Sequence, residues 1–166
     1  PDLPPNPRIL EVGCGTGKNI RYLEYLFPDA SIYGIDLSQD MLNRAQRKIN
    51  HSKRITLLNS RYGSKELDFE PFDLTLFSYT LTMLGDQTEH VLQQVLEDLN
   101  PRGYIAVVDF HDTPLNWFRW WMRNNHVEMN GQLLPLLNKY FAPEQSSVHK
   151  AYLGVWHYFL FIGRCG

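Results

Sequence analysis

Short apolar runs alternate with helix-like stretches along most of the chain. In the helix-like stretches apolar residues recur three or four positions apart, whereas the apolar runs are short enough for buried strands. This alternation predicts a doubly wound parallel sheet with right-handed crossovers between its strands. The strands are expected at Arg8–Val12, Ser31–Asp36, Ile55–Leu58, Phe72–Ser78 and Tyr104–Asp109.

Turn-forming and capping residues set the ends of the predicted helices. Pro28-Asp29 ends the first helix, Ser38 caps the second, and Asn100–Gly103 stops the third. Each of these helices lies between two strands, as the crossovers of a parallel sheet require. Helices are expected from about Lys18 to Phe27, from Ser38 to about Asn50, from Asp86 or Thr88 to near Leu99, over Pro114–Asn125 and over Gly131–Tyr140.

The C-terminal end differs, because two strand signals follow each other there. Gln145–Lys150 and Trp156–Ile162 are separated by a link so short that it permits only an antiparallel return. We therefore expect an α/β fold with a doubly wound, mostly parallel, seven-stranded Rossmann-like sheet and an antiparallel C-terminal strand. The 166 residues, of which 43% are hydrophobic, suit a single domain with one core.

Composition narrows the classes of partner. The net charge is −2 with both signs dispersed, so no nucleic-acid partner is expected. The two cysteines, Cys14 and Cys165, give no disulfide framework, and a reducing cytoplasm is the expected location. No apolar stretch approaches the roughly 18 residues that a membrane span needs. No metal site is expected, because no second ligand is suitably spaced from His111.

The most informative pattern is Ile-Leu-Glu-Val-Gly-Cys-Gly-Thr-Gly-Lys at Ile9–Lys18. Its apolar start fits a buried strand, and its glycines fit a tight turn into a helix whose free N–H groups attract an anionic group. Asp36 follows nineteen residues after Gly17, at the end of the second strand, where it can accept hydrogen bonds from both hydroxyls of a ribose. The pattern therefore indicates a nucleoside site. Cys14 lies inside it, where its small size explains it better than a catalytic thiol does.

Two details distinguish between nucleosides. The spacing is Gly-x-Gly-x-Gly, whereas dinucleotide folds prefer Gly-x-Gly-x-x-Gly, and Glu11 sits two residues before the first glycine. A carboxylate there would repel a pyrophosphate but suits S-adenosylmethionine, which carries an ammonium and a sulfonium. At this point the chain resembles the class I S-adenosylmethionine-dependent methyltransferases, whose first motif has this Glu-x-Gly-x-Gly-x-Gly form. The same details, with the antiparallel C-terminal strand, disfavour a nicotinamide-binding Rossmann domain.

The resemblance implies a role for each residue along this edge of the sheet. The glycine loop would lie against the methionyl moiety, Glu11 would act on its ammonium, and Asp36 would bind the ribose. Leu37 and Met41 would pack against adenine, with ordinary core packing as the alternative. Arg61 stands where many relatives have an Asp that accepts from the adenine amino group, which Arg cannot do, so backbone groups or packing would hold the adenine. The implied cofactor contacts are Glu11, Gly13, Cys14, Gly15, Thr16, Gly17, Asp36, Leu37, Met41, Arg61, Tyr62 and Ser78.

The segment Phe77–Met83 crosses the place where a methyl acceptor would lie. It lacks the Asn/Asp-Pro-Pro-aromatic signature of enzymes that methylate exocyclic base or amide nitrogens. It resembles instead the methyltransferases of betaine-lipid synthesis, which trimethylate the amine of a diacylglyceryl-homoserine head group. Further stretches that agree are Val107–Phe110, the aromatic helix followed by Val127 and Leu133–Leu137, and Tyr158 with Phe161–Gly163.

One predicted helix combines aromatic and basic residues, and three interpretations of it are open. Its aromatic faces could stabilise a quaternary ammonium, they could touch lipid head groups together with the arginines, or they could cover the sheet. Tyr79 is expected to face the transferred methyl, with Trp117 or a neighbouring aromatic on the far wall. His111 is expected to be a base or a hydrogen-bond partner, or else a solvent-facing loop residue. The helix carries Trp117, Phe118, Arg119, Trp120, Trp121 and Arg123.

These inferences combine into one functional hypothesis. The chain is expected to be an S-adenosylmethionine-dependent methyltransferase that methylates an amine on a lipid or small molecule, with Tyr79 and His111 as catalytic residues and with peripheral membrane contact. The alternatives are another small-molecule acceptor, such as a quinone precursor or small acid, and a non-catalytic binding module. The chain starts at Pro1 without Met, and Pro1–Pro7 holds four prolines, so we expect one domain over residues 1–166 without an N-terminal lid segment. The oligomeric state is left open.

Overall fold

Strand β1 (Arg8–Val12) lies in the middle of the sheet, where the burial of four of its five residues requires it to be. It pairs in parallel with β2 (Ser31–Asp36) on one side and with β4 (Phe72–Ser78) on the other. The computed structural model describes residues 1–49, 52–64 and 69–165. Within these residues one seven-stranded sheet forms, and its other strands are β3 (Ile55–Asn59), β5 (Leu99–Phe110), β6 (Ala142–Ala151) and β7 (Trp156–Arg164).

The strand order is β3-β2-β1-β4-β5-β7-β6. The chain therefore moves outward from β1 to β3, returns to β4 beside β1, and then moves outward on the other side. β7 inserts between β5 and β6 and runs antiparallel to both. This confirms the predicted doubly wound, mostly parallel sheet with an antiparallel C-terminal strand.

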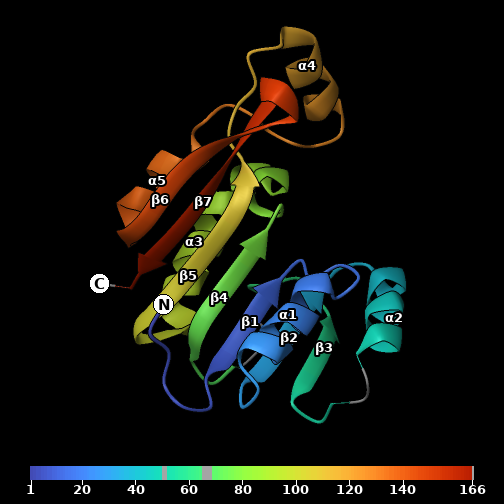
Figure 1. Cartoon of the computed structure of the whole chain (residues 1–166), viewed down its shortest axis with the longest axis vertical. Helices are drawn as coiled ribbons and strands as arrows, with labels where there is room; N and C mark the ends of the chain where they lie inside the picture. Colours follow the sequence, from blue (N-terminus) through green and yellow to red (C-terminus); the bar gives the residue numbers. More distant parts are fainter. Residues whose placement is uncertain (50–51, 65–68, 166) are drawn as a thin grey trace.

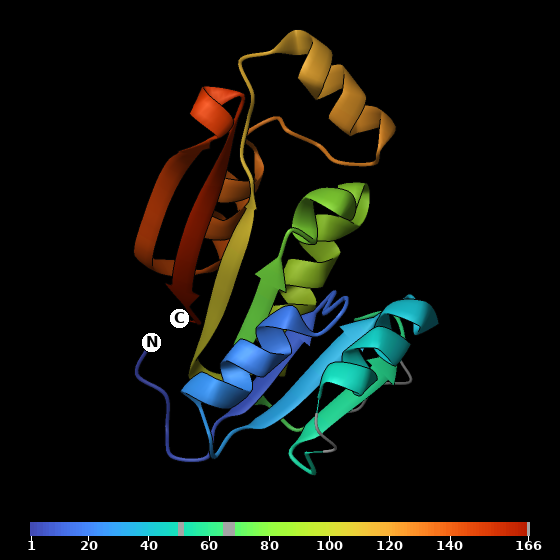
Figure 2. The ribbon, with the colours of Figure 1, turned by 45° about the vertical axis from the view of Figure 1, so that its right-hand side comes forward.

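Helices cover the two faces of the sheet and bury two separate layers of apolar side chains (Figures 1 and 2). On one face α1 (Lys18–Leu26) and α2 (Gln39–Lys48) pack over β1, β2 and β3. On the other face α3 (Thr88–Asp98) and α5 (Leu133–Tyr140) pack over β4, β5 and β7. Neighbouring residues of β1 show the division, because Ile9 belongs to the first layer and Leu10 to the second. Among the described residues, no helix combines the length and the apolar character that crossing a membrane would require.

A further helix, α4 (Asn116–Asn124), projects beyond the edge of the sheet at which the parallel strands end (Figure 1). It packs through a small apolar cluster of its own, formed by Met122, Val127 and Met129 with Phe110, Phe118 and Trp156 alongside. The main layers therefore do not enclose α4, which leaves most of its surface facing outward.

The observed ends of several elements differ from the predicted ones. β5 begins at Leu99 instead of Tyr104, because Leu99 already pairs with Phe72 before an irregularity in the register. α5 begins at Leu133 because Gly131 adopts a φ of 71°, which a helix cannot continue through. α4 is shorter than Pro114–Asn125, β6 is longer than Gln145–Lys150, and the predicted end of α2 at Asn50 lies outside the described residues. Three short 3-10 turns were not predicted: η1 (Leu81–Met83), η2 (Gly85–Gln87) and η3 (Tyr152–Gly154).

Candidate functional site

The glycine loop leaves the carboxyl end of β1 at the point where the strand order reverses. Such a switch point is where open α/β sheets hold ligands. The N–H groups of Gly13 and Cys14 both donate to the carbonyl of Ile35, at 2.8 and 3.0 Å, which ties the loop to the end of β2. Gly17 then forms the N-cap of α1 with a φ of 71°. The predicted strand–turn–helix arrangement of the motif is therefore present.

The three glycines of the motif meet different surroundings. A Cβ on Gly13 would lie 2.5 Å from Thr80 Oγ1, and a Cβ on Gly17 would lie 2.9 Å from Ala45 Cβ. A Cβ on Gly15 would meet no atom of the described residues within 4 Å. Close packing within the protein thus explains Gly13 and Gly17, whereas Gly15 borders open space in which a ligand can approach the backbone.

Asp36 links the glycine loop to the loop that begins α2. Its Oδ2 accepts a hydrogen bond from the N–H of Gly15 and its Oδ1 accepts one from the N–H of Ser38, each at 2.8 Å. Because each carboxylate oxygen carries two lone pairs, both oxygens keep one for a further donor. Asp36 is half-buried and lines a cavity, so this remaining capacity faces a space that a ligand can reach.

Glu11 is a buried carboxylate that has incomplete hydrogen bonding. Its Oε1 accepts from Asn19 Nδ2 at 2.8 Å, while its Oε2 has no partner among the described residues. The pKa of Glu11 is raised to about 7, mainly by burial; the Asn19 hydrogen bond opposes this rise, and the nearby charge of Asp36 adds to it. A cationic group placed beside Oε2 would satisfy it and favour its charged form.

Cys14 and Thr16 fill the other positions of the motif. Burial, together with the charges of Glu11 and Asp36, raises the pKa of the Cys14 thiol to about 12. The thiol is therefore protonated at neutral pH, which agrees with a packing role and excludes an activated nucleophile. Thr16 is half-buried, and its carbonyl accepts from Lys48 Nζ at 3.2 Å.

A cavity of about 560 Å³ opens beside Asp36 between the ends of β1, β2 and β4. It brings together residues that the sequence predicted separately: Gly13, Asp36, Leu37, Arg61, Tyr62, Ser78 and Tyr79. Thr80 and Met83, from the predicted acceptor segment Phe77–Met83, also line it. Because η2 and the start of α3 fold back over the site, the cavity also brings in residues that were not predicted: Leu84, Gln87, His90 and Val91. No motif marks these residues, and only the turn after β4 places them here.

The predicted adenine contacts separate into two groups. Leu37 is 67% exposed and lines the cavity, and Met41 is exposed but is not among the described residues lining it, so ordinary core packing is wrong for both. Arg61 is exposed at the cavity wall. Tyr62 turns inward, and its hydroxyl donates to Asp98 Oδ2 at 2.7 Å, so that burial and this hydrogen bond raise its pKa. The Tyr62 hydroxyl is therefore already engaged.

Tyr79 occupies a strained position at the end of β4. Its φ is 55°, a value that is uncommon for a residue with a side chain. The next three residues are held by the buried carboxylate of Asp109, whose Oδ2 accepts from the N–H groups of Thr80, Leu81 and Thr82 at 3.1, 2.8 and 3.2 Å. The cost of burying that carboxylate raises its pKa, and the hydrogen bonds oppose the rise. Asp109 lies in the stretch Val107–Phe110 that supported the sequence resemblance, but it was assigned no role of its own, although an acid at the end of an apolar strand is a signal that could have indicated one.

The ring of Tyr79 belongs to an aromatic cluster formed mainly by β5, η3 and β7. Its centroid lies 4.9 Å from that of Phe110 and 6.3 Å from that of Trp156. Tyr152 and Tyr158 extend the cluster around Trp156 at 6.1 and 5.8 Å. Burial raises the pKa of Tyr79, so its phenol stays protonated at neutral pH. We call these five residues, Tyr79, Phe110, Tyr152, Trp156 and Tyr158, the aromatic cluster.

The exposure of the α4 tryptophans removes one of the three interpretations that the sequence left open. Trp117, Trp120 and Trp121 are 65%, 68% and 51% exposed, so the interpretation that they cover the sheet is wrong. Trp117 packs on Phe118, while Phe110 and Trp156 are the aromatics that contact Tyr79. The local spacing on the helix could not show that β7 supplies the neighbouring ring.

His111 lies beyond β5 but outside the set of described residues that line the cavity. Its ring packs on Phe159 with centroids 6.2 Å apart, and a Cβ on Gly131 would lie 3.7 Å from its Cε1. The side chain is half-buried, so a freely solvated loop position does not describe it. Its Nδ1 has no hydrogen-bond partner among the described residues, and its predicted part in catalysis stays a prediction.

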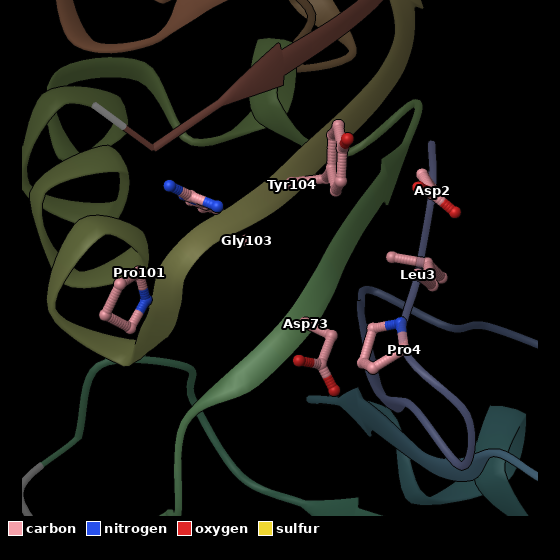
Figure 3. Close-up of a pocket in the computed structure, with 8 residues that line it drawn as sticks. Asp2, Leu3, Pro4, Asp73, Pro101, Gly103 and Tyr104 are labelled. Carbon is pink, nitrogen blue, oxygen red and sulfur yellow. The ribbon is translucent and has the colours of Figure 1, made fainter.

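A second hollow, of about 360 Å³, lies at the amino ends of β4 and β5 (Figure 3). Figure 3 shows Asp2, Leu3 and Pro4 beside it, across from Asp73, Gly103 and Tyr104. The oxygens of Asp73 accept from the N–H of Arg8 and from Asn100 Nδ2, both at 2.8 Å. These contacts are internal to the fold, and the hollow is at the opposite edge from the glycine loop, so we assign no nucleoside there.

A model of the methyltransferase domain family matches residues 9–103 of this chain. The match includes the glycine loop, Asp36 and β4, and it extends over more than half of the 166 residues. The chain belongs to the methyltransferase domain family. This confirms the resemblance to the class I S-adenosylmethionine-dependent methyltransferases.

Individual relatives of this methyltransferase domain differ in their named reactions. Trans-aconitate 2-methyltransferase of Yersinia pestis (strain Pestoides F) is 34% identical over 99 residues, which cover 60% of this chain and 36% of that protein. Carboxy-S-adenosyl-L-methionine synthase of Trichodesmium erythraeum (strain IMS101) is 31% identical over 106 residues, which cover 62% of this chain and 42% of that protein. The chain thus spans less than half of the length of these two relatives.

Among solved structures, the N-methyltransferase NodS from Bradyrhizobium japonicum WM9, in complex with S-adenosyl-L-homocysteine, superposes with a TM-score of 0.78. The two sequences are 19% identical, and the match covers 96% of this chain and 78% of NodS. This likeness shows the shared Rossmann-like fold. Because one fold hosts many reactions, the methyl acceptor of this domain needs an argument from its own residues, and these matches do not support the narrower betaine-lipid resemblance.

The unpartnered carboxylate of Glu11 leads to a prediction about stability. In the unfolded chain this group titrates at its ordinary pKa of 4.5, and in the fold its pKa is about 7. Below pH 4.5 the carboxyl group is protonated in both states, so its ionisation does not change the free energy of unfolding. As the pH rises from 4.5 to about 7, the unfolded chain ionises first and the free energy of unfolding falls, and the loss is complete once the folded state is ionised too. Glu11→Gln should therefore stabilise the ligand-free domain relative to the parent, by on the order of 3 kcal/mol more at about pH 8 than at about pH 5.

Denaturant unfolding at both pH values measures this difference. Glu97→Gln, on the exposed surface of α3, is the control for the loss of one carboxylate. A Glu11→Gln variant whose stability relative to the parent is the same at both pH values would contradict the buried, unpaired state of Glu11.

Proposed function

We propose that this domain binds S-adenosylmethionine at the glycine loop and transfers its methyl group to a small-molecule amine. The observation that carries the cofactor assignment is the unpartnered Oε2 of buried Glu11, which fits the ammonium of the donor. The open space at Gly15 fits the methionyl chain, and the remaining lone pairs of Asp36 fit the ribose hydroxyls. The donor set is therefore suited to a cationic nucleoside.

The residues of the chain mainly bind and orient the reactants. When bound, S-adenosylmethionine would supply a methyl group carried on a positively charged sulfur, and the neutral thioether would be the leaving group. Asp36 and the glycine loop would fix the nucleoside end, and Leu37 would cover the base from the exposed side. Tyr79, held at its strained φ and followed by the turn that Asp109 fixes, would face the acceptor. Such positioning can contribute about 7–11 kcal/mol to lowering a barrier.

The aromatic cluster favours an amine acceptor. A tertiary amine becomes a quaternary ammonium during transfer, and aromatic faces stabilise a desolvated cation by about 2 kcal/mol. Because the charge grows toward the transition state, this stabilisation would speed the transfer in addition to binding the acceptor. The phenol of Tyr79 is protonated at neutral pH, so its contribution would come from the ring face and the hydroxyl dipole, not from proton abstraction.

A carboxylic acid is the second candidate acceptor. The specific observation for it is that Arg61 and His90 both line the cavity, because an arginine pairs well with a carboxylate. The 34% identity with trans-aconitate 2-methyltransferase agrees with this alternative. The two candidates make opposite demands on the cavity, since one needs aromatic faces and the other needs a fixed cation.

Several finer expectations stay proposals of the same kind. A lipid-linked amine is the acceptor class that the sequence resemblance favours. The cytoplasmic location rests on the two thiols of Cys14 and Cys165, which are both free. Binding of the nucleoside without any transfer would favour the non-catalytic alternative.

Removal of the Asp36 carboxylate should weaken binding of S-adenosylhomocysteine more than tenfold, about 1.4 kcal/mol, because the ribose hydroxyls lose their acceptor. Calorimetry of Asp36→Ala measures the loss. Asp36 also holds the glycine loop, so the control ligand is S-adenosylhomocysteine that lacks both ribose hydroxyls. The substitution should weaken the binding of this control ligand much less. Equal losses for the two ligands, or tight binding of NAD instead, would refute the ribose assignment.

The open space at Gly15 allows a matched pair of substitutions. Gly15→Val and Gly154→Val both place a side chain at a positive φ, 51° and 90°, and neither Cβ meets a described atom within 4 Å. Both should cost similar stability in thermal unfolding, but only Gly15→Val should abolish binding of S-adenosylhomocysteine. Unchanged affinity in folded Gly15→Val would mean that the ligand does not approach this backbone.

The amine proposal predicts how Tyr79 affects turnover. Tyr79→Ala should lower kcat for amine methylation more than it raises KM for the donor, whereas Tyr79→Phe, which keeps the aromatic face, should retain most of the activity. Single-turnover methylation of a homoserine-type amine lipid and of a soluble dimethylamine compound measures this, with phenols and tricarboxylic acids as comparison acceptors. Transfer to the acids alone would replace the amine by the carboxylate candidate and leave the cofactor assignment intact.

A further inference from the structure

Helix α4 has two apolar faces, and only one of them is covered. Phe118 and Met122 point toward the body of the domain, where they pack in the cluster with Val127 and Met129. The ring of Phe118 also packs on Trp117 and Trp121. The three tryptophans recur at spacings of three and four residues, and they are 65%, 68% and 51% exposed. With Phe118 they border a hollow of about 400 Å³. Exposed apolar patches of this kind are typical of binding surfaces.

A second exposed apolar element lies at the same end of the molecule. In both views η3 and α4 lie beyond the ends of the parallel strands (Figures 1 and 2). Leu153, in η3, is fully exposed at 109% and has a φ of 59°, so the fold presents it to solvent at some cost in strain. Thr113 Oγ1, just ahead of α4, donates to the carbonyl of Val155 at 2.6 Å, which ties the two elements together.

The charges beside the tryptophans indicate what covers them. Arg119 and Arg123 lie one turn apart on α4, and the helix contains no acidic residue. Arg119 Nη2 donates to the carbonyl of Thr113 at 2.5 Å, which ties the guanidinium to the segment just ahead of the helix. A two-fold contact between copies of α4 would bring four arginines together without a carboxylate from either helix. An anionic surface is the complement that these charges favour.

We propose that α4 and η3 form a docking surface for a bilayer that contains anionic phospholipids. Trp117, Trp120, Trp121 and Leu153 would enter the interfacial layer, where tryptophan is preferred. Arg119 and Arg123 would pair with lipid phosphates at the margin of this face. The helix lies on the membrane and does not cross it, in keeping with its nine residues.

Docking in this way would bring the head-group layer next to the proposed acceptor site. Phe118 of α4 packs in the same apolar cluster as Phe110 and Trp156, and these two rings contact Tyr79. Packed side chains thus connect the docking helix with Tyr79 at the cavity. This last consequence rests on the proposed function, whereas the docking itself does not.

Co-sedimentation of the 166-residue chain with lipid vesicles tests the proposal in the absence of donor and acceptor. The vesicles are phosphatidylcholine alone and phosphatidylcholine mixed with phosphatidylglycerol. The parent chain should bind the mixed vesicles at least tenfold more tightly, with a blue shift of tryptophan emission, and should lose affinity as salt rises. Failure to bind either vesicle would overturn the docking proposal and leave the methyltransferase proposal untouched.

Two sets of variants assign the binding to α4. Joint replacement of Trp117, Trp120 and Trp121 by Ser should reduce binding to the mixed vesicles more than tenfold. The matched control replaces Tyr22, Tyr25 and Leu26 of α1 by Ser, because these are 60%, 82% and 61% exposed. The two tyrosines also line a hollow together with basic side chains. Arg119→Gln with Arg123→Gln should remove about tenfold to thirtyfold of the preference for phosphatidylglycerol.

The variants must keep their fold and their binding of S-adenosylhomocysteine, which calorimetry checks. Equal weakening by the α1 control would refute the assignment to α4. Sedimentation velocity without vesicles tests whether a second copy of the chain covers this face instead. If the parent chain is a dimer and the tryptophan replacements dissociate it, the lipid proposal is overturned.

Discussion

The hydrogen bonds of the Asp36 carboxylate hold together the edge of the sheet on which the rest of the site depends. The carboxylate accepts from the N–H groups of Gly15 and Ser38, which belong to the loops after β1 and β2. The parallel pairing of Val12 with Ile35 brings these loops to the same height, so one side chain can reach both. Because backbone N–H groups hold the carboxylate in place, its remaining lone pairs keep a fixed direction before any ligand arrives. Preorganised acceptors of this kind lower the cost of binding.

Asp109 does the same for the neighbouring loop, at a higher energetic cost. Its carboxylate is fully buried, and such a charge is tolerated only when hydrogen bonds satisfy it. Three successive N–H groups after β4 and the hydroxyl of Thr82 supply those bonds. This fixed turn follows directly on Tyr79, whose positive φ requires support from the surrounding structure. The strained tyrosine and the buried carboxylate are therefore two parts of one arrangement that aims a ring at the cavity.

The sequence allowed the prediction of features that depend on local physics. The sheet, its antiparallel last strand, the glycine turn and the Ser38 cap follow from residues that are close together in the chain. The neighbours of Tyr79 could not be predicted, because Trp156 reaches it only through the pairing of β5 with β7, in which Phe110 stands opposite Tyr158. For the same reason the sequence could offer only Trp117 or a neighbouring aromatic for the far wall, and Trp117 is not among the described residues that line the cavity. The exposure of apolar side chains could not be predicted either, since a residue such as Leu37 gives the same local sequence pattern in a core as at a cavity.

Among the unpartnered buried polar atoms of the described residues, that of Glu11 differs from those of two arginines. Arg8 and Arg164 each have a buried Nε without a partner, but their other nitrogens bind nearby oxygens, including the carboxylates of Glu70 and Glu144. Glu11 has only the neutral amide of Asn19, and the nearby carboxylate of Asp36 adds to the unfavourable field. A sequence selected for stability alone would replace or pair such a group. Its position beneath the glycine turn therefore supports the proposal that the folded domain binds a cation there.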